Sequence, residues 1–220
     1  MFFFVPFLKY KISPRNIFVT VSLFFIRHGE TDWNRERRIQ GMYGNPPLNE
    51  RGIQQAQRTS AFLSQYPFNA FYCSPLIRAL ETAKIIADPH TLTPVSNFYL
   101  SEMNYGEWEG KKREEITGSF PHEIKTEEES HFSCPGGESY YQAYHRFFQT
   151  VQKIVQQHPH QQIAVITHGS VLLLFLSKIL GTYKNAGISI DNCSIHRVLW
   201  NESGTFRLIT LNQIHHLDPV

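Results

Sequence analysis

The sequence predicts an α/β fold in a single domain, on three observations. Two short runs of apolar, β-branched and aromatic residues, Ile17–Ile26 and Ile163–Thr167, are typical of buried strands. Segments with the apolar spacing of amphipathic helices alternate with the strand-like runs along the chain. The length of 220 residues is sufficient for one sizeable core, and no internal repeat divides it.

In the first part of the chain, the strand at Ile17–Ile26 is followed by a loop rich in glycine, asparagine and proline, Gly41–Pro47. Asn49 then provides a polar N-cap for a helix that extends to about Phe62. Ala70–Cys73, with two aromatic residues, is predicted to form a short second strand.

A second helix is predicted to begin at Ser74 and Pro75, because a capping hydroxyl followed by proline at the first helical position is a common helix start. This helix extends to about Ala87 and places Arg78 in its first turn. After a proline-bounded break, Val95–Leu100 is predicted as the third strand, which brings the chain to Glu102.

The second half resumes the alternation after a polar insertion. Apolar positions recur at spacings of three and four from Tyr140 to about Pro159, which predicts an amphipathic helix. The fourth strand, Ile163–Thr167, is followed by a buried helix, Ser170–Leu180. A hairpin completes the prediction, with strands at Ser194–Trp200 and Phe206–Leu211.

These patterns divide the chain into an N-terminal extension (residues 1–16), a domain (residues 17–214) with a cap inserted at about residues 104–138, and a tail (residues 215–220). The extension lacks the basic segment and small-residue cleavage site of a secretory signal. We interpret it as a disordered lead-in, with a weak amphipathic anchor and a misassigned start as alternatives.

Composition limits the kinds of partner. The net charge is +2 with acidic and basic residues interspersed, so we expect a small anion as partner and not a nucleic acid. The apolar run Val171–Leu180 contains Ser177 and Lys178 and is shorter than the roughly 20 residues of a membrane helix, so no integral membrane segment is expected. Widely separated cysteines favour the reducing cytoplasm. The sequence leaves both a monomer and a homodimer open.

Two histidines follow two of the predicted strands, His28 after Ile17–Ile26 and His168 after Ile163–Thr167. Ligands of α/β sheets bind at the carboxyl ends of the strands, so we expect both imidazoles at one edge of the sheet. Arg27 also lies at a strand end, and Arg78 follows the second strand. The sequence therefore predicts a site with two histidines and two guanidinium groups.

These residue types suit phosphoryl transfer, which requires an in-line nucleophile, cations around the equatorial oxygens and an acid for the leaving oxygen. A neutral His28 is the candidate nucleophile, because nearby guanidinium groups disfavour its protonation. Arg27 and Arg78 would hold the phosphate, and His168 would add a third positive charge if protonated. Glu102, its pKa raised by the phosphate, is the candidate general acid. This chemistry requires no metal or other cofactor.

Each residue also has an ordinary structural interpretation when taken alone. Arg78 would be a helix-surface ion-pair partner and Glu102 a solvated carboxylate. We interpret Glu127–Glu129 as a solvated face, and Lys111–Arg113 as either a solvated face or a substrate contact. The chain has no phosphate-binding P-loop, nucleophile elbow or HExxH motif.

The site residues belong to a series of motifs that resembles the histidine phosphatase superfamily, also called phosphoglycerate-mutase-like. The matches span about residues 21–198, in the order that the family shows. The blocks are Arg27–Gly29, Glu30–Asn34, Arg38–Gly41, Pro47–Leu48, Gly52–Ala56, Cys73–Ala79 with Glu81–Ala83, Glu102, Tyr105–Gly110, Pro135–Ser139 and Thr167–Gly169.

The resemblance implies a three-layer α/β/α sandwich with a mostly parallel mixed sheet and a small inserted cap. It also implies His28 as the phosphorylated nucleophile and Glu102 as the proton donor. The phosphate and substrate contacts that it implies are Arg27, Asn34, Gln40, Gly41, Arg78, His168 and Gly169. Asn45 departs from the aspartate that many members have before Pro-Leu, and we expect this change to affect substrate contact more than chemistry.

Within the superfamily the sequence favours a phosphatase. Cofactor-dependent mutases resemble one another in a Glu-Arg-His-Tyr-Gly segment and a longer insertion, whereas residues 102–106 here lack the Arg-His pair. A short cover lets water reach a phosphohistidine. The predicted function is metal-independent hydrolysis of a small phosphorylated metabolite through a phosphohistidine. A cofactor-dependent phosphoglycerate mutase is the alternative, followed by a non-catalytic phosphate-binding module.

Overall fold

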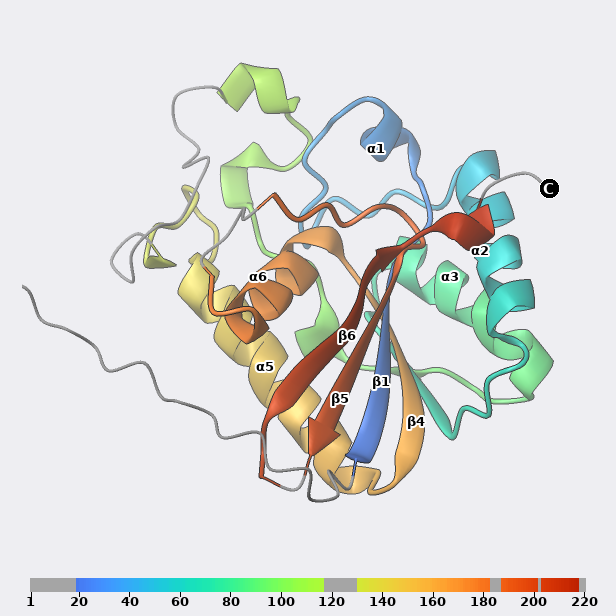
Figure 1. Cartoon of the computed structure of the whole chain (residues 1–220). Coiled ribbons are helices and arrows are strands. Elements are labelled where there is room, and N and C mark those ends of the chain that lie inside the picture. Colours follow the sequence, from blue (N-terminus) through green and yellow to red (C-terminus); the bar gives the residue numbers. More distant parts are fainter. Residues whose placement is uncertain (1–18, 117–129, 183–186, 202, 218–220) are drawn as a thin grey trace, which may run out of the picture.

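The computed structural model describes residues 19–116, 130–182, 187–201 and 203–217. Its centre is a six-stranded sheet with the strand order β3-β2-β4-β1-β5-β6 (Figure 1). The strands are β1 (Val19–Arg27), β2 (Ala70–Cys73), β3 (Val95–Ser96), β4 (Gln161–Thr167), β5 (Ile195–Asn201) and β6 (Phe206–Gln213). The first four are parallel to one another, and β5 and β6 add antiparallel pairs. The predicted α/β fold with a mostly parallel mixed sheet is confirmed.

Helices cover both faces of the sheet (Figure 1). The longer ones are α2 (Glu50–Leu63), α3 (Ile77–Ala87), α5 (Tyr140–Gln157) and α6 (Gly169–Ile179). Successive side chains of a strand point to opposite faces, and β1 shows this directly. Leu23 and Phe25 lie in the cluster with α5 and α6, whereas Phe24 and Ile26 lie in the cluster with α2 and α3. The three-layer arrangement is therefore confirmed.

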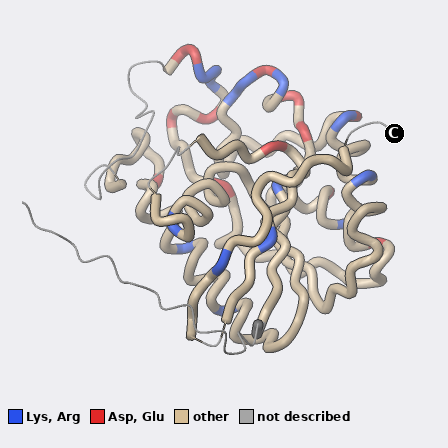
Figure 2. Tube along the Cα trace, viewed as in Figure 1, with Lys and Arg blue, Asp and Glu red and all other residues tan. Residues whose placement is uncertain are grey.

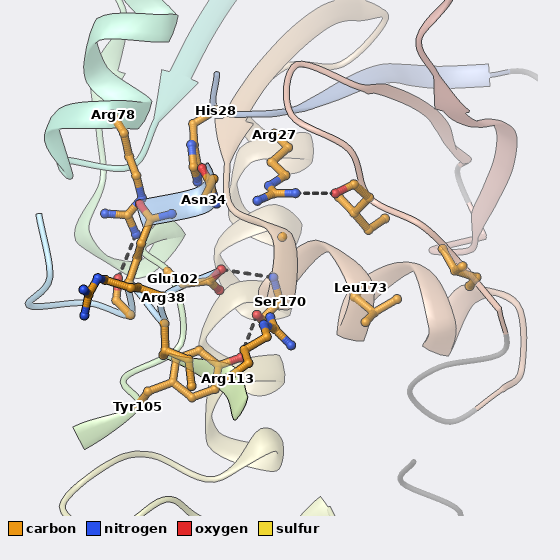
Figure 3. A pocket seen from close by; sticks show the side chains of 16 residues that line it. Arg27, His28, Asn34, Arg38, Arg78, Glu102, Tyr105, Arg113, Ser170 and Leu173 are labelled. Atoms are coloured by element: carbon orange, nitrogen blue, oxygen red, sulfur yellow. Dashed lines mark hydrogen bonds between the residues drawn. The ribbon is translucent and has the colours of Figure 1, made fainter. Parts of the chain in front are cut away.

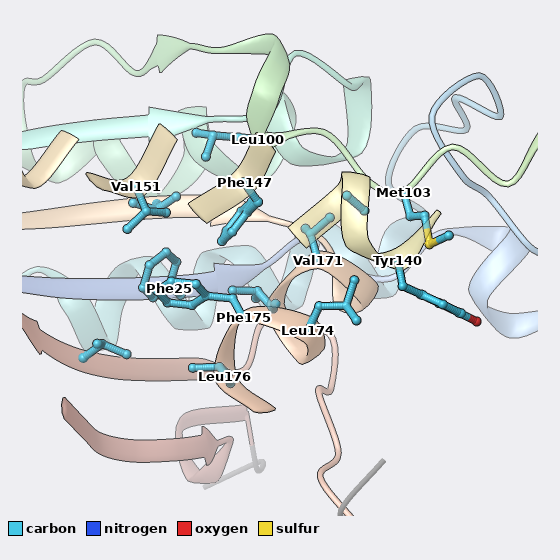
Figure 4. Close-up of a cluster of buried hydrophobic side chains, with 14 of the residues drawn as sticks. Phe25, Leu100, Met103, Tyr140, Phe147, Val151, Val171, Leu174, Phe175 and Leu176 are labelled. Atoms are coloured by element: carbon cyan, nitrogen blue, oxygen red, sulfur yellow. The ribbon is translucent and has the colours of Figure 1, made fainter. Parts of the chain in front are cut away.

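The core beneath α5 and α6 is rich in aromatic residues (Figure 4). The Phe175 ring centroid lies 5.2 Å from that of Phe25 on β1 and 5.6 Å from that of Phe147 on α5. Aromatic pairs at such distances each contribute about 0.5–1.5 kcal/mol beyond the burial of their area. This packing fixes the central strand against the helix that follows β4.

The third strand is shorter than predicted. Only Val95 and Ser96 pair with β2, and Phe98–Leu100 forms a 3-10 turn. The cause is Asn97, whose side-chain oxygen accepts a hydrogen bond from the amide of Tyr99 at 2.9 Å and so begins a turn. The turn buries Leu100 and directs the chain towards Glu102.

Two helix starts also differ from the sequence prediction. α3 begins at Ile77, two residues after Pro75, although Arg78 still lies in its first turn. A short helix that was not predicted, α1 (Asp32–Arg35), follows β1 and begins with a capping box between Thr31 and Asn34. The other 3-10 turns are Asp88–His90, Gly106–Trp108, Arg113–Ile116 and His215–Leu217.

Candidate active site

The two histidines expected at one edge of the sheet lie side by side. β1 and β4 are neighbouring parallel strands, with Arg27 opposite Thr167 at their carboxyl ends. The amide of His28 donates to the carbonyl oxygen of Thr167 at 3.0 Å. The ring centroids of His28 and His168 are 5.1 Å apart. Strand order therefore brings these two distant parts of the sequence together.

A pocket of about 250 Å³ opens beside His28 (Figure 3). Eight of the residues that the sequence assigned to the site line it: Arg27, His28, Asn34, Gln40, Gly41, Arg78, Glu102 and Gly169. The ninth, His168, does not line the pocket and is fully buried next to His28.

The hydrogen bonds of His28 select one tautomer. Its Nδ1 lies 2.7 Å from the carbonyl oxygen of Gly29, which can only accept, so Nδ1 carries the proton. The lone pair is therefore on Nε2. Burial lowers the pKa of His28 well below its ordinary value, and the charges of Arg78 and Arg27 lower it further. The ring is neutral and able to act as a nucleophile, with burial as the larger cause and the guanidinium groups as the smaller one.

Arg78 is fully buried, and the loop after α1 holds its guanidinium group. Nη1 donates to the carbonyl oxygen of Gly44 at 2.9 Å, and Nη2 donates to that of Gly41 at 2.7 Å. Burial lowers its pKa to about 10, so the group stays charged at neutral pH. Its Nε has no hydrogen-bond partner among the described residues.

Arg27 shows the same partial use of its donors. Its Nη1 donates to the carbonyl oxygen of Ile190 at 2.6 Å, and its Nε has no hydrogen-bond partner among the described residues. A buried guanidinium is expected to satisfy its donors, because leaving them unpaired is unfavourable. The free donors of Arg27 and Arg78 therefore fit a pocket that takes an anion.

His168 does not supply the third positive charge that the sequence suggested. Burial lowers its pKa well below the ordinary value, followed by the charge of Arg78, so the ring is neutral. Neither ring nitrogen has a hydrogen-bond partner among the described residues. The hydrogen-bonding capacity of the ring is therefore unused within the described part of the chain.

Glu102 lies at the first turn of α6 (Figure 3). Its carboxylate accepts hydrogen bonds from the amides of Ser170 at 3.1 Å and Val171 at 3.3 Å. It also accepts one from the amide of Met103 at 2.9 Å. The positive end of the helix dipole and these donors orient the carboxyl group at the edge of the pocket.

Asn34 is oriented by the capping box. Its Oδ1 accepts hydrogen bonds from the amide of Thr31 at 3.2 Å and from Nδ2 of Asn192 at 3.3 Å. The same Asn192 amide donates to the carbonyl oxygen of His28 at 3.0 Å. Because Oδ1 is engaged in this way, Nδ2 of Asn34 is the group that can donate to a ligand in the pocket.

The structure places Asn45 at the start of a helix. Asn45 does not line the pocket. Its Oδ1 accepts a hydrogen bond from the amide of Ile77 at 2.8 Å, which satisfies one of the free donors at the start of α3. The departure from aspartate therefore lies at a helix end, and its effect on substrate contact stays a prediction.

The basic cluster Lys111–Arg113 was interpreted as either a solvated face or a substrate contact, and its residues differ in this respect. Arg113 lines the pocket, whereas Lys111 and Lys112 do not, and Lys112 lies 3.9 Å from Glu114. Acidic and basic residues alternate along the loops around α1 (Figure 2). The acidic run Glu127–Glu129 lies outside the described residues.

Several lining residues were not assigned to the site from the sequence. Arg38 and Tyr105 stand within the motif blocks, and Ser170 follows Gly169, so their positions were an available signal. No sequence signal indicated that Leu173, Ile188 and Ile190 line the pocket. Only the folding of the segment after α6 over the pocket brings the last two into place.

Comparison with known proteins agrees with this geometry. The sequence profile of the histidine phosphatase superfamily (branch 1) matches residues 23–214. Phosphoserine phosphatase 1 of Hydrogenobacter thermophilus is 30% identical over 201 residues, which cover 90% of this chain and 94% of that protein. A probable phosphoglycerate mutase, GpmB of Yersinia pestis, is 32% identical over 190 residues, covering 83% and 86%.

A solved structure is similar over the same extent. The phosphoserine phosphatase of Entamoeba histolytica, in complex with 3-phosphoglyceric acid, superposes with a TM-score of 0.77 at 27% identity. The similarity covers 90% of this chain and 100% of that one. No helix in the described part of the chain is both long and apolar enough to cross a membrane.

Proposed function

The chain belongs to the histidine phosphatase superfamily, and on this premise we propose that it hydrolyses phosphomonoesters through a phosphohistidine at His28. The observation that carries the proposal is the state of His28. The ring is neutral, its proton is on Nδ1 and its lone pair on Nε2. His28 lines a pocket together with two guanidinium groups that have free donors.

In the first step, Nε2 of His28 attacks phosphorus and the bond to the ester oxygen breaks. Arg27 and Arg78 donate to the equatorial oxygens, and Nδ2 of Asn34 adds a further donor. Protonated Glu102 gives its proton to the leaving oxygen, so the products are an alcohol and a phosphohistidine with Glu102 as carboxylate.

In the second step, Glu102 removes a proton from a water molecule as its oxygen attacks phosphorus. The phosphorus–nitrogen bond breaks, inorganic phosphate forms, and His28 returns to its neutral state. Gly29 holds the Nδ1 proton through both steps, so the reacting nitrogen remains Nε2. The buried guanidinium groups supply the positive charge that the transition state needs.

The proposed substrates are small phosphorylated metabolites, because the pocket has a volume of only about 250 Å³. The Hydrogenobacter relative is named a phosphoserine phosphatase, and the Entamoeba structure holds 3-phosphoglyceric acid. Phosphoserine and phosphoglycerates are therefore the first compounds to test. Three buried thiols without disulfide bonds support a reducing compartment such as the cytoplasm.

A phosphoglycerate mutase is the second candidate, because the similar Yersinia protein carries that name. The test is phosphate release from a panel of phosphomonoesters with EDTA present. The same preparation is assayed for isomerisation of 3-phosphoglycerate with and without 2,3-bisphosphoglycerate. We expect EDTA-resistant release from a subset of the panel. Isomerisation that depends on the bisphosphate would assign the mutase, and inactivity in both assays would leave a phosphate-binding module.

A further inference from the structure

Glu109 binds three consecutive backbone amides of one loop. Its Oε2 accepts from the amides of Tyr43 and Gly44, both at 2.7 Å, and its Oε1 accepts from that of Met42 at 2.9 Å. Oε1 also accepts from the amide of Tyr105 at 3.1 Å. Successive amides of this kind form a concave anion-binding nest, and here a side chain of the same protein occupies it.

The segment that carries Glu109 is itself fixed. The amide of Gly110 donates to the carbonyl oxygen of Ile39 at 2.8 Å, and the amide of Ile39 donates to that of Lys111 at 3.0 Å. These bonds hold residues 109–111 alongside the segment that leads into the loop of residues 41–44, termed here the carbonyl loop. The carboxylate therefore has a defined position opposite the loop.

The other side of the carbonyl loop holds Arg78. The carbonyl oxygens of Gly41 and Gly44 accept hydrogen bonds from its guanidinium group at 2.7 and 2.9 Å. One peptide unit makes both kinds of contact, because its carbonyl belongs to Gly41 and its N–H to Met42. This peptide lies between the carboxylate and the guanidinium, with its dipole aligned with both charges.

We propose that Glu109 is a positioning residue for phosphate binding, which acts on Arg78 through the carbonyl loop. Glu109 does not line the pocket, so it does not touch the substrate. Its carboxylate fixes the two carbonyl oxygens that orient the guanidinium group, and thereby directs the free donors of Arg78 at the phosphate. The expected effect on KM rests on the proposed function, whereas the expected effect on the affinity for an anion does not.

Gly41 provides independent support. Its backbone is left-handed, with φ of +62°, and a Cβ added there would lie 2.0 Å from Oε1 of Glu109. The carboxylate thus occupies the space that a side chain at position 41 would need. An alanine at this position is expected to displace the carboxylate from the nest and to strain the left-handed backbone of the same loop.

The main test replaces Glu109 by glutamine, because the amide nitrogen cannot accept from the loop amides. Glu107→Gln is the matched control, since Glu107 is an exposed carboxylate two residues earlier. Orthovanadate affinity is measured by calorimetry, and kcat and KM are measured with p-nitrophenyl phosphate. We expect Glu109→Gln to weaken vanadate binding and raise KM, each by about tenfold to a hundredfold. We expect Glu107→Gln to match the wild type in both.

A double-mutant cycle separates positioning from a general structural effect. Arg78→Lys removes the forked contact with the carbonyl loop. If Glu109 acts through Arg78, Glu109→Gln weakens vanadate binding much less in the Arg78→Lys background than in the wild type. Equal losses in the two backgrounds would overturn the proposal, as would unchanged vanadate affinity in Glu109→Gln.

A further measurement decides the question if Glu109→Gln fails to fold. In the wild type, bound vanadate is expected to slow hydrogen exchange at the amides of Met42, Tyr43 and Gly44, and unchanged exchange would count against the coupling. A wild type that binds vanadate without hydrolysing any ester would refute the proposed function and leave the role of Glu109 testable. A wild type that binds no vanadate would refute both.

Discussion

Arg146 and Glu138 form a bidentate ion pair next to the backbone of Glu102, the candidate general acid. Nε of Arg146 donates to one carboxylate oxygen at 2.9 Å and Nη2 donates to the other. The same guanidinium donates to the carbonyl oxygens of Tyr99, Ser101 and Glu102, at 3.0, 2.8 and 2.8 Å. One side chain of α5 therefore holds the backbone that presents Glu102 to the pocket.

Arg146→Met is expected to lower the free energy of unfolding by about 3–5 kcal/mol, because it leaves Glu138 and three carbonyl oxygens without their partner. Denaturant unfolding measures the change. The control is Arg35→Met, whose pair with Asp32 is exposed and is expected to contribute under about 1 kcal/mol. Equal effects of the two substitutions would contradict the importance of the Arg146 cluster.

His28→Ala is expected to reduce kcat more than about a thousandfold, because it removes the nucleophile and with it the covalent intermediate. Circular dichroism should show an unchanged fold. His131→Ala removes an exposed imidazole and serves as the control, with wild-type activity expected. A His28→Ala protein that retains its rate would exclude the proposed mechanism.

Glu102→Gln is expected to slow hydrolysis of alkyl phosphates more than hydrolysis of p-nitrophenyl phosphate. Nitrophenolate leaves without a proton, whereas an alkoxide requires one from Glu102. The measurement is the ratio of kcat values for the two substrates in each protein. A ratio that does not change would remove Glu102 from the role of acid.

Stability is expected to fall on acidification below about pH 6.5, the ordinary pKa of histidine. Burial lowers the pKa values of His28 and His168, and lowers that of His196 to about 4. Between the ordinary and the lowered values the unfolded chain binds more protons than the folded one, so protons favour unfolding. Urea unfolding at pH 7.5, 6.0 and 5.0 tests this, and a constant unfolding free energy would contradict it.

Asn45→Asp is expected to leave stability and KM close to the wild-type values, because aspartate also accepts from the amide of Ile77. Asn45→Ala is expected to lower the unfolding free energy by about 1 kcal/mol through loss of this acceptor. Thermal unfolding and KM are measured for both variants. A large change in KM for Asn45→Asp would indicate that Asn45 contacts the substrate.

Local sequence patterns were sufficient to predict where several residues of the site lie. Strand-like runs placed His28 and His168 at strand ends, and a helix start placed Arg78 in a first turn, because each of these signals lies within a few residues. Asn97 shows a limit of this reasoning, since its side chain ends β3 after two residues.

The remaining features depend on tertiary contacts. Arg27 donates a hydrogen bond to the carbonyl oxygen of Ile190, although the two residues are far apart in the sequence. Glu109 likewise contacts the carbonyl loop from a different segment of the chain. Burial, the main cause of the lowered His28 pKa, exists only once the layers have assembled. No local pattern encodes such contacts, so the sequence identified the participants but not what holds them.

The free Nε donors of Arg27 and Arg78 have a consequence for inorganic phosphate, the product of the proposed hydrolysis. Inorganic phosphate offers the same oxygens as the substrate, so it is expected to compete for the pocket and inhibit turnover. A ligand of this kind also stabilises the folded state, by about 2.7 kcal/mol at a hundred times its dissociation constant. Phosphate buffer is therefore expected to raise the temperature of thermal unfolding and to lower the rate of turnover in an assay. In a compartment rich in phosphate, the rate of turnover would depend on how fast phosphate leaves the pocket.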